Sequence, residues 1–471
     1  MNIFPTQIGY TKVTPPVFEM PKRPADLSDQ VYEAHKSRTL SAMKNLGMDA
    51  LVVYADREHG SNFGYLTGFE PRFEEAVLVL LPDGTASVLL GNECLKMHAY
   101  SRIPVTPIHT PFFSLPNQPM EGERPLEQVF AQAGIQEGMT VGVAGWKLFT
   151  GKDPRNTFLM DVPHFIVQAL IEAVGDTGIL KNGTGLFIHA DTGVRNTVCA
   201  EEAAAYEFGA AMASYCVQQV LESLCVGANE QELASLLSRY GMPLSCYSMC
   251  ATGERFTNGV VYPRDKKVCL GDKFTTSMGL RGGLTCRAGY VADTAQDLPQ
   301  EVEDYVEKVA KPYFAATATW YSTVGIGVSG GEVYWAVDGV FPKKDYGWKL
   351  NPGHLSSSEE WMSSPISAGS PVLLRSGMML QMDIIPSVPG YGGINAEDGV
   401  LLADERLREE IHTQFPEVWN RMQRRREYMI KELGIPLKEE VLPMTDSVGY
   451  LRPLLLNREM ALKVTHLAVG R

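Results

Sequence analysis

The chain has 471 residues, of which 42 are Lys or Arg and 55 are Asp or Glu, so its formal net charge is −13. This acidic balance disfavours a nucleic-acid partner, which requires a basic face, and a hydrophobic content of 45% excludes large-scale disorder. No apolar run reaches the roughly 18 residues of a membrane span. The first residues lack a basic, apolar leader, and the eight cysteines include no CxxC pair, so we expect a cytoplasmic protein that binds no membrane.

The first part of the chain alternates predicted helices and strands. Ser28 is a good N-cap for a helix that ends at Gly47, and an apolar run of strand length follows at 49–56. Residues 75–91 predict a β-hairpin around a Pro-Asp-Gly turn. Further helices are expected near 91–101, 126–133 and 161–174, and a strand at 139–145. This alternation predicts an α/β domain over residues 1–190.

Helices followed by strands characterise the rest of the chain. The predicted helices cover 199–224, 229–241, 299–322 and 405–433, and the predicted strands cover 245–251, 272–280, 377–386 and 399–405. The segment GIGVSGG (325–331) satisfies two glycine-rich motifs at once, but a helix precedes it, so it predicts a helix-to-helix turn. The pattern indicates a second, α+β domain over residues 195–471 with a helical tail.

Three carboxylates and one imidazole in the second domain are candidate metal ligands. Asp293, His354, Asp383 and Glu397 together would suit Mn, Fe, Co or Zn in a hydrolytic site. Their spacing alone could not select them from 55 acidic residues and nine histidines. Without further information, a turn residue and a surface acid are the simpler interpretations of Asp293 and Glu397.

The sequence around these residues resembles a known family. GYVADTAQ (289–296), NPGH (351–354) and the segment from Gly377 to Asp404 resemble the signature segments of the creatinase/prolidase/aminopeptidase P superfamily, peptidase family M24. Residues 55–84, which contain Tyr-Leu-Thr-Gly-Phe before the predicted hairpin, are similar to the small domain of the same proteins. The resemblance implies a small creatinase-like α/β domain followed by a pita-bread catalytic domain.

The resemblance also implies a site with one metal ion. Asp293, His354, Asp383 and Glu397 match the ligands of one of the family's two ions, whereas Ser277 replaces the aspartate on which the other ion depends. Val260 and Trp361 stand where the family has its two catalytic histidines. Ordinary proline-specific peptidase action is therefore in doubt, because protonation of the leaving amine needs a positioned acid.

The function that the resemblance implies is that of a divergent hydrolase. It would cleave a C–N bond in a small-molecule or short-peptide substrate with a single divalent ion, and Glu397 or Asp383 would assist water. Glu359 or Glu360 is the candidate replacement acid, and a solvated pair of loop residues is the simpler interpretation of these two. Two alternatives stay open. One is a metal-free, creatinase-like hydrolase of a small zwitterion that uses Cys286 or Cys269. The other is a non-catalytic binding or scaffold protein.

Polar and aromatic residues of the first domain are candidates for substrate binding. Arg57 and His59 precede the Tyr-Leu-Thr-Gly-Phe run, Tyr65 begins it and Arg72 follows it, and a guanidinium there would recognise a substrate carboxylate. In the family that this chain resembles, the small domain of one subunit reaches the active site of its partner, so a homodimer is expected. Simple surface solvation is the alternative interpretation of this segment.

Overall fold

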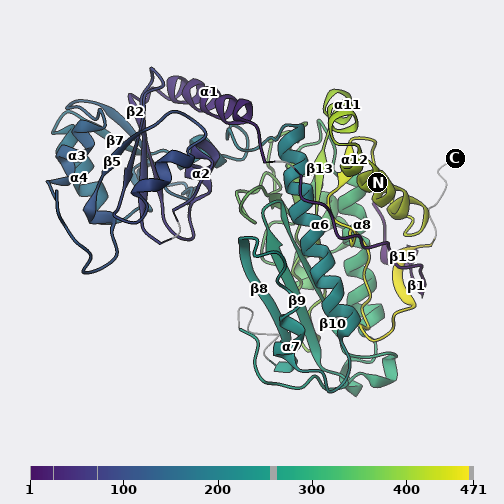
Figure 1. The fold of residues 1–471 in the computed structure, drawn as a ribbon. Coiled ribbons are helices and arrows are strands. Elements are labelled where there is room, and N and C mark those ends of the chain that lie inside the picture. The colour runs from purple at the N-terminus through teal and green to yellow at the C-terminus, as the bar shows by residue number, and fades with distance from the viewer. Residues whose placement is uncertain (1, 25, 72, 255–261, 466–471) are drawn as a thin grey trace. The chain divides into compact units, whose positions relative to one another are not determined.

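The chain folds into two compact units, Leu27–Asn196 and a second unit that combines Met1–Asp26 with Thr197–Arg471 (Figure 1). This description comes from a computed structural model, which describes the chain except residues 1, 25, 72, 255–261 and 466–471. Within the described residues, no helix is long and apolar enough to cross a lipid bilayer.

The unit Leu27–Asn196 is built on a six-stranded sheet of order β5-β4-β3-β2-β6-β7. The strands are β2 (Ala50–Ala55), β3 (Ala76–Leu80), β4 (Ala86–Leu90), β5 (Thr106–His109), β6 (Thr140–Ala144) and β7 (Ile179–Asn182). The helices are α1 (Asp29–Asn45), α2 (Ser61–Thr67), α3 (Leu126–Gln132), α4 (His164–Val174) and α5 (Thr184–Ile188). Every residue of β2, β3 and β4 is buried, as expected for strands covered on both faces.

The second unit contains a seven-stranded sheet of order β11-β12-β13-β10-β9-β8, with β14 paired to β13. The strands are β8 (Leu244–Thr252), β9 (Lys273–Leu280), β10 (Gly283–Tyr290), β11 (His354–Leu355), β12 (Met379–Met382), β13 (Asn395–Leu402) and β14 (Val441–Pro443). The helices are α6 (Ala200–Ser223), α7 (Glu230–Ala234), α8 (Lys311–Thr323), α9 (Gly330–Val340), α10 (Lys343–Tyr346), α11 (Glu405–Gln414) and α12 (Pro416–Lys431).

Helix α6 packs on β9 and β10, the hairpin at the centre of this sheet. The helix comes very close to the hairpin's turn at Gly209, where an added Cβ would lie 1.8 Å from the carbonyl oxygen of Arg281. Only glycine therefore allows this approach, because real Cβ atoms do not come within 3 Å of a carbonyl oxygen. The contact fixes the position of the hairpin whose strands carry Ser277 and Cys286.

The first residues of the chain pack with the second unit, in contrast to the domain that we expected over residues 1–190. Strand β1 (Ile8–Lys12) pairs antiparallel with β15 (Met460–Val464), so that Ile8 lies opposite Val464. The amide of Ile3 donates a hydrogen bond to Thr319 Oγ1 over 2.8 Å. The correction has a physical reason: β1 is a short edge strand whose hydrogen-bonding partner lies at the other end of the chain, where no local pattern reveals it.

Several expected elements differ in extent. The helix expected over 229–241 is only α7, the helix expected near 91–101 is a 3-10 helix over Leu95–Tyr100, and the strand expected over 377–386 is only β12. The helix expected over 299–322 begins instead with a π-helical segment at Val306–Ala310 and continues as α8. Pro312 in the first turn of α8 cannot donate a backbone hydrogen bond, which accounts for the irregular entry.

The expected tail helix is two helices, α11 and α12, which meet at Phe415-Pro416 because proline is accommodated best at the start of a helix. The expected turn at 325–331 is confirmed, because it joins α8 to α9 and Ser329 caps α9. Strand β10 was not predicted. Its sequence, GLTCRAGY, lacks a period-two pattern because all eight residues are buried.

Candidate functional site

A row of side chains crosses the central sheet of the second unit. Ser277 on β9 lies opposite Cys286 on β10, and Cys286 lies opposite Glu397 on β13. Met382 of β12 lies opposite Asp398 of β13. Because the two strands are antiparallel, the residue after Met382, Asp383, lies next to the residue before Asp398, Glu397. Because directly opposed residues of antiparallel strands point to the same face, these side chains share one face of the sheet.

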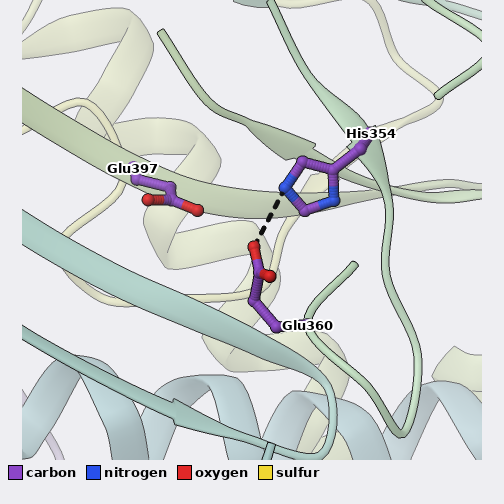
Figure 2. Close-up of side chains that lie close together, drawn as sticks. All are labelled: His354, Glu360 and Glu397. Atoms are coloured by element: carbon purple, nitrogen blue, oxygen red, sulfur yellow. Dashed lines mark ion pairs between the residues drawn. The ribbon is translucent and has the colours of Figure 1, made fainter. Parts of the chain in front are cut away.

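His354 joins this face from β11, where it lies opposite Gln381 of β12. Glu360 follows six residues later and turns back toward the histidine, so that Glu360 Oε1 lies 3.1 Å from His354 Nε2 (Figure 2). One ligand atom from each of His354, Glu360 and Glu397 lies within 4.8 Å of the others. The indole of Trp361 stacks on the His354 ring, with a centroid separation of 4.0 Å.

Burial dominates the electrostatics of this cluster. It raises the pKa of Glu397 well above its ordinary value, and the carboxylates of Asp383 and Glu360 raise it further. Burial also raises the pKa of Asp383 to about 6, although His354 acts in the opposite direction. For His354 itself burial lowers the pKa, but the Glu360 carboxylate, which accepts from His354 Nε2, and the charge of Asp383 outweigh it, so the net shift is upward. The cluster therefore concentrates negative charge where water cannot stabilise it.

The opposite face of the same strands carries a fully satisfied network. Asp398, next to Glu397 in β13, forms a buried ion pair with Arg287 and accepts hydrogen bonds from the hydroxyls of Thr285, Thr445 and Ser447. Adjacent carboxylates on one strand thus have different surroundings. Asp398 is neutralised by a cation within the protein, whereas Glu397 faces other carboxylates.

The donors of the cluster fit a divalent cation. Asp383 Oδ1 and Ser277 Oγ are buried and form no hydrogen bond with any described residue. An unsatisfied buried polar group costs about 1–3 kcal/mol, and mutually repelling buried carboxylates add to that cost. A cation held between an imidazole and carboxylates would relieve both, and such a mixed nitrogen and oxygen donor set suits a transition metal.

The structure does not bring the predicted ligand Asp293 into this cluster. Asp293 is exposed at the end of the segment that follows β10, where its amide donates a hydrogen bond to Asp297 Oδ2 over 3.0 Å. The strand position beside Glu397 belongs to Cys286 instead. The reason is geometric: hydrogen-bonded register, which no local motif encodes, decides which residue of β10 faces β13.

The structure brings together the other predicted ligands and the predicted acid. His354 and Glu397 contribute to the cluster with Glu360, which we had expected only as a replacement acid. Asp383 interacts electrostatically with all three. A sequence signal existed for part of this arrangement, since Gly282 and Gly283 favour a tight turn. The two-residue turn at Arg281-Gly282 puts Cys286 opposite Ser277, but no local signal placed β10 beside β13.

The candidate substrate-binding residues lie in the other unit and have different surroundings. Arg57 is exposed beside Glu58, and His59 stacks on Trp146 with its centroid 4.8 Å away and its Nδ1 3.1 Å from Asp56 Oδ1. Arg57 and His59 line a surface hollow of their own unit. Tyr65 is a packing residue, stacked on His35 at 3.7 Å with its hydroxyl donating to the carbonyl of Val194. Arg72 and Val260 lie outside the described residues.

Comparison with known proteins finds the same fold in solved structures. No protein-family model matches the sequence, and neither does any curated protein. The Xaa-Pro dipeptidase from Bacillus anthracis is 16% identical, with a TM-score of 0.59 over 80% of this chain and 96% of that one. The dipeptidase PepE from Mycobacterium ulcerans is 18% identical, with a TM-score of 0.61 over 80% and 95%. The recombinant prolidase from Thermococcus sibiricus is 19% identical, with a TM-score of 0.61 over 81% and 96%. The expected fold class, a small α/β domain with a pita-bread α+β domain, is confirmed.

Proposed function

We propose that this chain is a divergent hydrolase of the creatinase/prolidase/aminopeptidase P superfamily, which cleaves a C–N bond in a small peptide-like substrate at a single divalent metal. One observation carries the proposal: His354, Glu360 and Glu397 present three ligand atoms within 4.8 Å of one another in the pita-bread unit. As in the family that this chain resembles, the working form would be a homodimer.

His354, Glu360 and Glu397 would hold the ion, with Asp383 beside them. The ion, one of Mn, Fe, Co or Zn, would polarise a substrate carbonyl and make water a stronger nucleophile at neutral pH. Asp383 is the best candidate to accept the proton of that water, since its Oδ1 has no hydrogen-bond partner in the described part of the chain and its pKa is raised to about 6. Glu360, whose side chain is 21% exposed, can exchange that proton with solvent.

The metal-free alternative receives less support. Cys269 is exposed and is absent from the cluster. Cys286 is present on the site's face, but burial and the charges of Glu397 and Asp383 strongly raise the pKa of its thiol. A neutral thiol is a poor nucleophile. Since no described histidine other than His354 belongs to the cluster, no second base is in place to activate it.

A substrate screen tests the proposed function. We expect metal-dependent hydrolysis of small non-proline amides or amino-acid derivatives, detected by mass spectrometry of both products.

Xaa-Pro dipeptides should be hydrolysed at least about 10²-fold more slowly than these substrates. A positioned general acid–base group contributes about 10²–10⁴ in rate, and Trp361 stands where one of the family's histidines would be. Turnover of Xaa-Pro dipeptides near 10 s⁻¹, a median enzyme rate, would contradict this specificity. Hydrolysis that persists after complete removal of metal would contradict the metal-dependent mechanism.

The purified protein should carry about one transition-metal ion per chain. The physical reason is that Ser277 offers a neutral hydroxyl at its buried position, and a hydroxyl binds a hard cation much less well than a carboxylate does. Elemental analysis after growth with added metals measures this number. Two tightly held ions per chain would show that other residues complete a second site, and no ion at all would remove the basis of the proposal.

A further inference from the structure

Cys286 is a buried thiol on the face of the sheet that carries the proposed metal site. It lies between Ser277 and Glu397 in the cross-strand row, and only 5% of the residue is exposed. Its Sγ lies 3.9 Å from Thr275 Oγ1, which is the one hydrogen-bond contact recorded for the thiol among the described residues. The thiol thus lies beside Glu397 on the same face of the sheet as the cluster, with almost no other partner among the described residues.

Unsatisfied polar atoms surround this thiol on the same face. Ser277, directly opposite, is fully buried, and its Oγ has no hydrogen-bond partner among the described residues. Asp383 is 4% exposed, and its Oδ1 is likewise unpartnered. The strand register places these groups and Cys286 on one face of the sheet, and the Asp398 network lies on the other face.

We propose that the thiolate of Cys286 is an additional ligand of the metal ion, so that the centre combines sulfur, imidazole and carboxylate donors. This inference rests on the proposed function, since it concerns the same ion. A donor set that includes thiolate favours zinc, cobalt or cadmium over manganese and magnesium. When the ion binds, a metal–sulfur bond forms, the S–H bond breaks and one proton passes to solvent, with no change of oxidation state.

Cobalt is the probe that reveals a sulfur ligand directly. Adding Co²⁺ to chelator-treated protein should give visible absorption bands from the bound ion and also a near-ultraviolet band from sulfur-to-cobalt charge transfer. In Cys286→Ser the visible bands should persist while the near-ultraviolet band disappears. Co²⁺ affinity should fall about tenfold or more, in the range that losses around a metal site produce.

The same sheet offers two matched thiol controls. Cys250 is also buried, but it lies opposite Thr276, the neighbour of Ser277 in β9, and therefore on the other face of the sheet. Cys250→Ser should leave the visible and near-ultraviolet bands unchanged. Cys246 lies opposite Gly279 on the site's face and interacts electrostatically with Glu360. Retention of the near-ultraviolet band in Cys246→Ser would support Cys286 as the sulfur ligand. Circular dichroism of each variant verifies that it is folded.

The outcomes separate the two ideas. Visible bands without a near-ultraviolet band in the unmodified protein would overturn the sulfur ligand and leave the metal site intact, as would a band that survives Cys286→Ser. Failure of Co²⁺ to produce any band would overturn both the sulfur ligand and the metal-dependent function.

Discussion

Replacing Glu397 with glutamine should stabilise the metal-free protein and abolish its stabilisation by metal. Burial raises the pKa of Glu397, and Asp383 and Glu360 raise it further, so the ionised form is disfavoured in the folded state. Glutamine keeps the shape without the charge. We expect about 1–3 kcal/mol of added stability without metal, as found when buried charges are replaced by neutral groups of similar volume.

The size of this effect depends on pH. A carboxyl group whose pKa is raised by folding costs nothing when it is protonated in both states, and it destabilises progressively as pH rises above its unfolded value of about 4.3. The difference between Glu397→Gln and the unmodified protein should therefore be small near pH 4 and grow toward pH 8. Thermal unfolding in chelator at several pH values measures it.

With metal present the order should reverse. A ligand at 1,000 times its Kd stabilises the unmodified protein by about 4.1 kcal/mol, which exceeds the advantage of the variant in chelator. Glu397→Gln should gain almost nothing from metal because one charged donor is missing. Glu410→Gln, which alters a partly exposed residue of α11 paired with Arg406, is the matched control and should respond to metal as the unmodified protein does. A Glu397→Gln variant that is less stable in chelator, or that metal stabilises normally, would contradict the assigned role.

Replacing Glu207 with alanine should destabilise the second unit by about 3–5 kcal/mol, the cost of breaking one side of a buried ion pair. Glu207 is a fully buried residue of α6, and its carboxylate pairs with both Arg421 and Arg425 of α12. Arg425 also lies 2.7 Å from Asp446 Oδ1. Removal of Glu207 leaves two guanidinium groups inside the protein with one remaining carboxylate.

Denaturant unfolding measures this loss, and Glu410→Ala provides the comparison. The Arg406–Glu410 pair is mostly exposed on the arginine side, and its N–O distance is 2.8 Å. Exposed pairs of this kind contribute about 0.5 kcal/mol or less. Equal effects of the two substitutions would show that the Glu207 pairs contribute no more than a surface pair.

Local patterns were sufficient for much of the fold. Helix α1 starts after Ser28 as predicted, although the Ser28 side chain makes no capping hydrogen bond. The strands on either side of the Pro-Asp-Gly turn are likewise found, at β3 and β4. The break between α11 and α12 falls at Pro416. The helical pattern continues across this proline, so the sequence predicted a single helix over 405–433. Strand β10 could not be predicted from an alternation of apolar and polar residues, because both of its faces are covered and all eight residues are buried.

The site was predictable to the extent that its ligands sit in distinctive segments. His354 in NPGH and Glu397 near the glycine-rich turn could be selected by resemblance, and both contribute to the cluster. Asp293 matched a segment equally well but lies seven residues beyond the position that faces Glu397. Strand register is a property of paired strands, so only the structure could replace Asp293 with Cys286.

The pairing of β1 with β15 constrains the order in which parts of the chain can fold during translation. A ribosome that adds about 5–20 residues per second makes Met460–Val464 roughly 20–90 s after Ile8–Lys12. During that interval the nascent β1 has no partner strand, while all six strands of the unit Leu27–Asn196 have already been translated. The inserted unit can therefore fold first, and the sheet of β1 and β15 closes only after Met460–Val464 has been made.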